Sequence, residues 1–236
     1  MSKIKIVLLG PYNSGKSTTV QNICGGTAIS IDYGGTTVAL DHCRTQIYGV
    51  EIFLFGTPGL QRFEIIRKIL SKGADGILFV VDSLNIASFE EAANLLKEVY
   101  DILPGVPIVL CANKQDIRGA KQPYEVAEAV LGKNKESISV IGTSAKTGEN
   151  IERALGLIVL NAIKQYYNIL LAVKKSNGNL KEIAQNVNES EEKVLSQLQF
   201  ASWRRLIIAD WDNKKFCLSK GVSHITDILE FGHKQF

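Results

Sequence analysis

Short hydrophobic runs alternate with helical patterns along the first two thirds of the chain. The runs predict strands buried on both faces, at Lys3–Leu9, Ile77–Val81, Ile108–Cys111 and Ile138–Ile141. The helical patterns begin near Lys16 and recur at about 63–73, 88–102, 123–132 and 149–165. This alternation predicts an α/β fold with a doubly wound, mostly parallel sheet of about six strands. Ligands of such sheets bind beyond the carboxyl ends of the strands.

Between the first predicted helix and the second buried strand the pattern is different. Residues 25–36 are rich in Gly, Ser and Thr, which predicts a loop. The β-rich segments Thr37–Tyr48 and Glu51–Phe55 follow, and Gly49 separates them. We therefore expect a β-hairpin here.

The pattern changes again near residue 166. Hydrophobic residues at helical spacing predict helices over 166–175, around Leu180–Val187 and around Val194–Leu198. Two short β-rich segments and a final helix follow, at Leu206–Ala209, Phe216–Leu218 and Ser223–Phe231. Three helices followed by a hairpin are the order of a winged-helix domain. We predict domains over 1–165 and 166–236, or alternatively one continuous helix over 149–175 that links both parts. Trp203 and Trp211 are expected to anchor the small core.

Composition narrows the class of protein. Hydrophobic residues make up 45% and charged residues 22% of the 236 residues, which is typical of a globular protein. The net charge of +3 argues neither for nor against nucleic acid. No hydrophobic run approaches the roughly 18 residues of a membrane span, and neither end carries a lipid-anchor signal. The four cysteines are scattered without a C-x-x-C pair. We expect reduced, mostly buried thiols and a cytoplasmic location.

Four short motifs stand at the predicted ends of strands. Gly10-Pro-Tyr-Asn-Ser-Gly-Lys-Ser-Thr18 fits the phosphate-loop pattern, in which glycines let successive N–H groups point at phosphate oxygens. Lys16 is expected to neutralise the β- and γ-phosphates, and the Ser17 hydroxyl to bind Mg²⁺. The other motifs are Gly56-Thr-Pro-Gly59, Asn113-Lys-Gln-Asp116 and Thr143-Ser-Ala-Lys146. Their order and spacing resemble those of a guanine-nucleotide-binding switch, and this resemblance implies that the bound nucleotide is GTP.

These motifs resemble those of the Ras-superfamily small GTPases, nearest to the Arf, Rab and prokaryotic MglA-like branches. The resemblance covers about residues 3–165. It implies binding of GTP and GDP with Mg²⁺, slow hydrolysis, two loops that rearrange between the states, and protein effectors or regulators as partners of a monomer or homodimer. The phosphate-binding residues that it implies are Gly10, Tyr12, Asn13, Ser14, Gly15, Lys16, Ser17 and Thr18.

The resemblance also implies how guanine is recognised. The Asp116 carboxylate would accept hydrogen bonds from the ring N–H and the exocyclic amine of guanine. Asn113 would brace the base, and the stem of Lys114 would cover its face. The segment Ser144, Ala145 and Lys146 resembles the loop whose backbone N–H reaches the guanine O6 atom.

The switch segments depart from the family pattern. Thr37, or Thr36 by a slip of one residue, would close onto Mg²⁺ and the γ-phosphate, and Gly59 would offer its N–H to the same phosphate. Gly56 stands where the family carries an aspartate. Leu60 stands where it carries the glutamine that orients the attacking water, and Leu60 has no hydrogen-bonding atom.

The candidate catalytic residues are therefore Lys16, Thr37, Gly59 and Gln61, where Gln61 substitutes for the missing glutamine. We expect intrinsic hydrolysis to be slow. The bulk of Tyr12 lies where small residues often admit a partner's arginine.

Two classes of function remain open. The first is a regulatory GTPase whose C-terminal domain engages protein partners or docks on the GTPase part. The second is a nucleotide-sensing, DNA-binding transcriptional regulator. DNA is the weaker alternative, because the third C-terminal helix begins Ser190-Glu-Glu-Lys193 and the part from residue 166 carries only about +2. A basic patch at Arg204, Arg205, Lys214 and Lys215 keeps it open. Asp116 disfavours an ATP-dependent enzyme.

Overall fold

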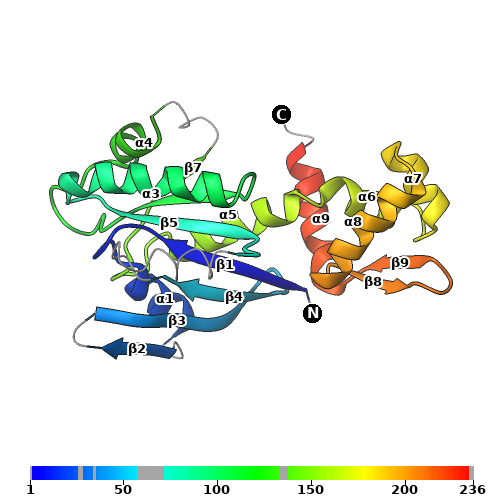
Figure 1. Cartoon of the computed structure of the whole chain (residues 1–236), viewed down its shortest axis with the longest axis horizontal. Helices are drawn as coiled ribbons and strands as arrows, with labels where there is room; N and C mark the ends of the chain where they lie inside the picture. The colour runs from blue at the N-terminus through cyan, green and yellow to red at the C-terminus, as the bar shows by residue number, and fades with distance from the viewer. Residues whose placement is uncertain (1, 26–28, 34–35, 58–71, 133–137, 234–236) are drawn as a thin grey trace. The chain divides into compact units, whose positions relative to one another are not determined.

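The computed structural model describes all residues except 1, 26–28, 34–35, 58–71, 133–137 and 234–236 (Figure 1). Internal contacts divide the chain into two units. We call Lys5–Thr45 with Phe53–Val159 the N-terminal unit. The C-terminal unit comprises Leu160–Phe236 together with the short segments Met1–Ile4 and Gln46–Ile52. The division at residues 165 and 166 stays a prediction.

A seven-stranded sheet in the order β2-β3-β4-β1-β5-β6-β7 confirms the predicted α/β class. Strands β1, β5, β6 and β7 are parallel neighbours, with Leu8 beside Leu78 and Leu78 beside Val109. The strand bounds are β1 Lys3–Leu9, β2 Ile29–Tyr33, β3 Thr36–Ile47, β4 Val50–Gly56, β5 Gly76–Asp82, β6 Ile108–Asn113 and β7 Ser139–Gly142. Every residue of β5 and β6 is buried, which explains their unbroken hydrophobic sequences.

The prediction of a loop over residues 25–36 was wrong, because this segment contains a strand that makes the sheet seven-stranded. Strand β2 lies inside this segment and pairs antiparallel with β3, with Ile29 opposite His42 and Tyr33 opposite Thr36. Its sequence, Ile-Ser-Ile-Asp-Tyr, alternates hydrophobic and polar residues. That alternation is the pattern of a strand, and the surrounding glycines and threonines obscured it.

Helices cover the sheet of the N-terminal unit. Their bounds are α1 Lys16–Cys24, α3 Phe89–Ile102, α4 Pro123–Leu131 and α5 Ile151–Lys164, with a short 3₁₀ turn at Ile86–Ser88. Residues of α3 and α4 pack on β1, β5 and β6 in one hydrophobic core (Figure 1). Ala92, Leu95, Leu96 and Val99 form the buried stripe of α3, at the spacing of one helix face. The helix predicted at about 63–73 lies mostly outside the described residues.

The expectation that all four cysteines are reduced was wrong for two of them. Cys24, at the end of α1, and Cys43, in β3, are both buried and form a disulfide with a Cα–Cα distance of 6.2 Å. Their separation of 19 residues in the chain gave no sign of the pairing. Cys111 is a free thiol in β6, and burial raises its pKa to about 12. Burial thus favours the protonated form of this thiol.

The C-terminal unit contains the predicted order of elements, although its winged-helix identity stays a prediction. The bounds are α6 Tyr167–Lys175, α7 Leu180–Val187, α8 Glu191–Trp203, β8 Ile207–Asp210, β9 Lys215–Leu218 and α9 Lys220–His233. The alternative of one continuous helix over 149–175 was wrong, because α5 ends at Lys164 and α6 begins at Tyr167. None of the described helices is by itself long and apolar enough to cross a membrane; only α5 and α6, counted together as a bent pair, meet that measure.

The predicted anchoring role of the two tryptophans was also wrong. Trp203 is 63% exposed and Trp211 is 44% exposed. The buried face of α8 is formed by Val194, Leu198 and Ala201, which recur at helical spacing. Trp203 falls off this face, so the core of the unit closes without it.

The turn between β3 and β4 belongs to the C-terminal unit. Tyr48 and Gly49 have φ values of 51° and 77°, the positive pair that a type I′ hairpin turn requires. Gly49 and Gly221 of α9 approach closely, since a Cβ on Gly49 would lie 3.1 Å from the Gly221 Cα atom. The N-terminal segment adds hydrogen bonds, because the Ser2 hydroxyl donates to the Arg205 carbonyl oxygen at 2.9 Å. Both segments are therefore integral to this unit.

Candidate nucleotide-binding site

The loop from Gly10 to Gly15 joins β1 to α1, and its shape depends on residues without side chains. Gly10 and Gly15 have φ values of 146° and 100°, a region that L-residues rarely adopt. A Cβ at Gly10 would collide with the Val80 carbonyl oxygen, and a Cβ at Gly15 with the Asn113 side chain. The two glycines of the motif are therefore required by close contacts with β5 and β6.

The Lys16 ammonium is folded over this loop. Its side chain is buried, and Nζ donates to the carbonyl oxygens of Gly10 at 2.9 Å and Pro11 at 2.7 Å. Helix α1 has no acidic residue in its first turn, so its positive end faces the loop without a competing carboxylate. The loop thus concentrates positive charge where an anion can approach its backbone.

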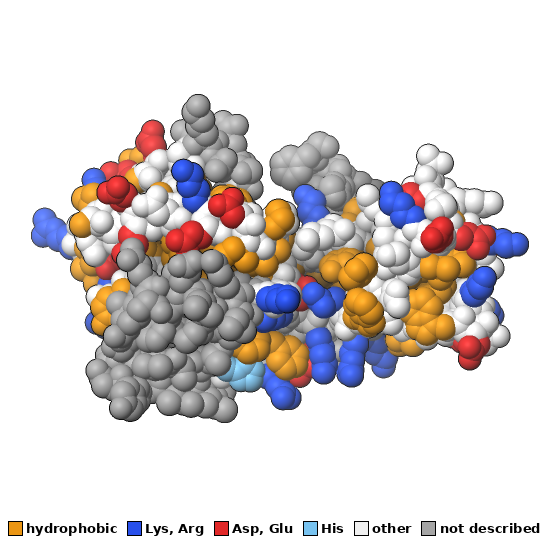
Figure 2. All heavy atoms as spheres, in the orientation of Figure 1, with side chains coloured by type: hydrophobic (Ala, Val, Ile, Leu, Met, Phe, Trp, Pro, Cys, Tyr) orange, Lys and Arg blue, Asp and Glu red, His pale blue; other side chains and the backbone are white. Residues whose placement is uncertain are grey.

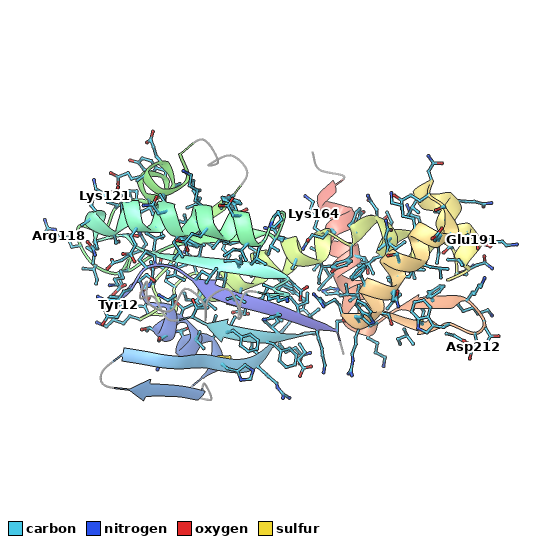
Figure 3. All side chains as sticks on the ribbon, in the orientation of Figure 1. Tyr12, Arg118, Lys121, Lys164, Glu191 and Asp212 are labelled. Carbon is cyan, nitrogen blue, oxygen red and sulfur yellow. A yellow bond between two sulfur atoms is a disulfide. The ribbon has the colours of Figure 1, made fainter. Side chains whose placement is uncertain are left out.

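The remaining residues of the motif differ in exposure. Ser14 is fully buried and Ser17 is half-buried in the first turn of α1. Tyr12 is 55% exposed and projects outward from the loop (Figure 3). Asn13 has a left-handed φ of 60°, and Thr18 is exposed. Tyr12 and Thr18 are therefore open to solvent, whereas Ser14 belongs to the packed base of the loop.

Asn113 connects three of the predicted motifs. It lies at the end of β6 and is 1% exposed. Its Nδ2 donates to the Ser14 carbonyl oxygen at 2.9 Å, and its Oδ1 accepts from the Ala145 backbone N–H at 2.9 Å and from the Thr143 hydroxyl at 3.4 Å. One buried amide therefore ties the phosphate loop to the segment after β7.

Lys114 has a partner that the sequence did not reveal. Its ammonium lies 2.6 Å from the Asp82 carboxylate, and its backbone φ is 70°. Asp82 is the last residue of β5 and lies opposite Asn113 in the parallel register. The sequence signal that could have identified Asp82 was its position at the end of a buried strand, the same position that Asn113 occupies. This ion pair orients the Lys114 stem.

The Asp116 side chain is exposed and accepts a hydrogen bond from the motif at residues 143–146. The Ser144 hydroxyl donates to Asp116 Oδ1 at 2.7 Å, and Ser144 is itself fully buried. Ala145 is buried beside Asn113, while Lys146 is exposed. The carboxylate is thus fixed in position by a buried hydroxyl and keeps its second oxygen for another donor.

The structure describes the switch segments only in part. The backbone of Thr37 lies in β3, paired with Asp32, and Thr36 pairs with Tyr33. Gly56 ends β4, and the Thr57 hydroxyl donates to the Leu8 carbonyl oxygen at 2.9 Å. Gly59, Leu60 and Gln61 lie outside the described residues. The structure therefore brings together the phosphate loop, with Lys16, and the two base motifs. Of the other predicted catalytic residues it describes only the backbone of Thr37.

The protein side chains near the phosphate loop suit a magnesium ion that would be held mainly by the phosphates of a bound nucleotide. Within the described residues, no group of three or more His, Cys, Asp or Glu side chains forms a metal site. Mg²⁺ commonly binds through one or two protein groups with phosphates and waters rather than a protein cage. The Ser17 hydroxyl, which the sequence predicts as one such group, lies in the first turn of α1.

Comparison with known proteins agrees with this geometry. The family model described as Ras family matches residues 5–164. The Ras-related protein Rab-40A-like of Homo sapiens is 35% identical over 134 residues, which cover 53% of this chain and 46% of that protein. The GTP-binding protein ypt4 of Schizosaccharomyces pombe is 26% identical over 68% of this chain and 71% of its own length.

An archaeal relative matches as well. An uncharacterized protein of Methanocaldococcus jannaschii is 30% identical over 49% of this chain and 72% of its own length. The chain spans about half the length of the human relative, at 46%, and more of the yeast and archaeal ones. The match to the Ras model covers every motif of the site and more than half of the chain, and the chain therefore belongs to the Ras family of small GTPases.

Proposed function

We propose that this protein is a regulatory switch that binds GTP and GDP and hydrolyses GTP slowly. The observation that carries the proposal is the hydrogen-bond network of Asn113, which joins the phosphate loop to the base motifs through a buried side chain. A nucleotide that spans both regions needs them at a fixed separation. The name of the yeast relative, a GTP-binding protein, supports the same ligand.

The phosphates would be held by backbone N–H groups of residues 10–18 and by the Lys16 ammonium. When the nucleotide binds, Nζ would exchange the carbonyl oxygens of Gly10 and Pro11 for phosphate oxygens. Ser17 and Thr37 are the proposed protein ligands of Mg²⁺, which neutralises charge on the β- and γ-phosphates. Gly56 offers no carboxylate, so metal affinity would depend more strongly on Ser17 and the phosphates.

The base would be selected by the Asp116 carboxylate, because guanine presents two N–H donors on one edge and adenine does not. Ser144 holds one carboxylate oxygen, which supports the required orientation. The stem of Lys114 would cover the base face, held by its ion pair with Asp82. The Ala145–Lys146 segment would offer a backbone N–H to the guanine O6 atom.

Isothermal titration calorimetry with Mg²⁺ and each nucleotide tests the ligand directly. The nucleotide-free chain is expected to bind GDP and GTP with dissociation constants about 1,000-fold or more below those of ADP and ATP, because two hydrogen bonds to a charged acceptor separate the bases. Equal affinity for the guanine and adenine nucleotides, or no binding of either, would contradict the proposal.

The hydrolysis rate depends on Leu60, which stays a prediction from the sequence. Leu60→Gln is expected to raise the single-turnover rate of GTP hydrolysis about 10-fold or more, since an amide can orient the attacking water. Gln61→Ala tests the substitute and should lower the wild-type rate. Wild-type turnover of several per second without a partner, or no change in either variant, would show that the assignment of these residues is wrong.

For the C-terminal unit, the distribution of charge favours a protein partner over DNA. Helix α8 begins with Glu191 and Glu192, whose carboxylates would repel phosphates. A gel-shift assay with GTP, GDP and no nucleotide distinguishes the two candidates. Nanomolar binding to duplex DNA at physiological salt would instead favour a nucleotide-sensing transcriptional regulator.

A further inference from the structure

A cleft of about 940 Å³ lies within the C-terminal unit. It is lined by the turn of the β3–β4 hairpin, the end of α8, strand β8 and the beginning of α9. Its volume falls in the range of binding pockets, which is about 300–1,000 Å³. The nucleotide-binding role described above makes no use of it.

Arg205 lines this cleft from a backbone conformation that favours glycine. Its φ is 52°, and it directly follows the end of α8. Its N–H donates to the Ser202 carbonyl oxygen at 2.8 Å, and the next N–H, of Leu206, donates to the Ala201 carbonyl oxygen at 2.9 Å. This is the helix-ending motif in which glycine or asparagine normally occupies the left-handed position. An arginine here costs about 1 kcal/mol or more.

Three basic side chains line the cleft. Arg205 and Lys220 are exposed, and His224 lies one helical turn after Lys220 on the same side of α9. In the described part of the chain none of these three side chains has an ion pair, and the described residues that line the cleft include no Asp or Glu. The charge of the cleft is therefore complementary to carboxylates.

Strand β8 presents its main chain to the cleft. Ile207, Ile208 and Ala209 all line it, although successive side chains of a strand point to opposite faces. The small sheet contains β8 and β9 only, and the far edge of β9 is bridged by Asn179. Within the described residues, β8 thus has one strand neighbour and one open edge. An open edge is where an extended peptide can add a strand.

Hydrophobic side chains border the same region. Ile208 is 64% exposed and Tyr48 is 39% exposed, and both line the cleft. On the visible face of the C-terminal unit, hydrophobic and Lys or Arg side chains lie next to one another (Figure 2). Exposed hydrophobic groups beside unpaired cations are typical of a protein interaction surface rather than of a solvated face.

We propose that this cleft binds an extended, acidic segment of a protein partner. The segment adds main-chain hydrogen bonds along β8, places carboxylates on Arg205 and Lys220, and packs hydrophobic side chains on Ile208 and Tyr48. The proposal commits to a peptide because a nucleic acid would use the cations but neither the open strand edge nor the hydrophobic groups. It goes beyond the nucleotide switch and does not depend on it.

The test uses the full chain as purified and a fluorescein-labelled peptide of alternating glutamate and valine. Arg205→Gly relieves the left-handed strain and removes one cation. Lys214→Gly is the matched control, because Lys214 also has a positive φ of 50°, is exposed, and lies in the β8–β9 turn outside the cleft. Both variants change the net charge equally, and both are expected to melt at or above the wild-type temperature.

Fluorescence anisotropy is expected to show that Arg205→Gly weakens peptide binding about 10-fold or more and that Lys214→Gly changes it less than about twofold. A peptide with glutamine in place of glutamate, and one with a central proline that removes N–H donors, should each bind about 10-fold or more weakly. No wild-type binding below about 1 mM, or equal losses in both variants, would overturn the proposal. Tighter binding of a 20-base-pair DNA duplex, lost with Arg205→Gly, would also overturn it.

Discussion

Replacing Asn113 by alanine is expected to lower the affinity for GDP by about 100-fold and to lower the free energy of unfolding by about 2–4 kcal/mol. The substitution removes the donor to the Ser14 carbonyl oxygen and the acceptor of the Ala145 N–H. Both remaining groups are buried, and each buried polar group left without a partner costs about 1–3 kcal/mol. The phosphate loop and the segment after β7 would then lose their fixed separation.

The measurements are the dissociation constant of a fluorescent GDP analogue and chemical denaturation of the same sample. Gln115→Ala is a suitable control, because the Gln115 amide donates to the Ser83 hydroxyl and the Lys121 carbonyl oxygen without reaching the phosphate loop. It should lower stability while leaving GDP affinity within about threefold. Equal loss of affinity in the two variants would mean that Asn113 acts only through general stability.

Asp116→Asn is expected to lower GDP affinity by about 100- to 1,000-fold and to create a preference for xanthosine diphosphate. In the proposed site the carboxylate would accept from two guanine donors, and hydrogen bonds to a charged group contribute about 1.5–3 kcal/mol each. Asparagine replaces one acceptor by an N–H₂ donor, which matches the carbonyl oxygen that xanthine carries in place of the exocyclic amine. Its remaining oxygen can still accept from the Ser144 hydroxyl, so the loop should keep its shape.

Competition between guanosine and xanthosine diphosphates in calorimetry measures this change. Glu149→Gln removes a nearby exposed negative charge from the same loop region and should leave both affinities unchanged. If Asp116→Asn lowered the affinity for both diphosphates equally, the carboxylate would be a structural group and the base would be recognised elsewhere.

Some elements were predictable because their environment leaves a simple pattern. Strands β5 and β6 are covered on both faces, so their sequences are hydrophobic throughout. Helix α3 has one buried face, and its hydrophobic residues recur at helical spacing. Strand β2 was missed because a short alternating segment between glycines resembles a loop by composition. Trp203 illustrates a different error: it was predicted to lie in the core but is exposed. Hydrophobicity alone does not show which face of α8 is buried.

The chain by itself determined the family and the positions of the phosphate-loop and predicted base motifs, because these depend on residue types at fixed local spacing. Tertiary structure alone decided which distant groups meet. The Asp82–Lys114 ion pair follows from the register of β5 and β6, and the Cys24–Cys43 disulfide from the meeting of α1 with β3. The cleft around Arg205 likewise requires the β3–β4 turn to lie with α9 in one unit. Such pairings depend on which distant segments of the backbone the fold brings together, and the local spacing of residues does not indicate this.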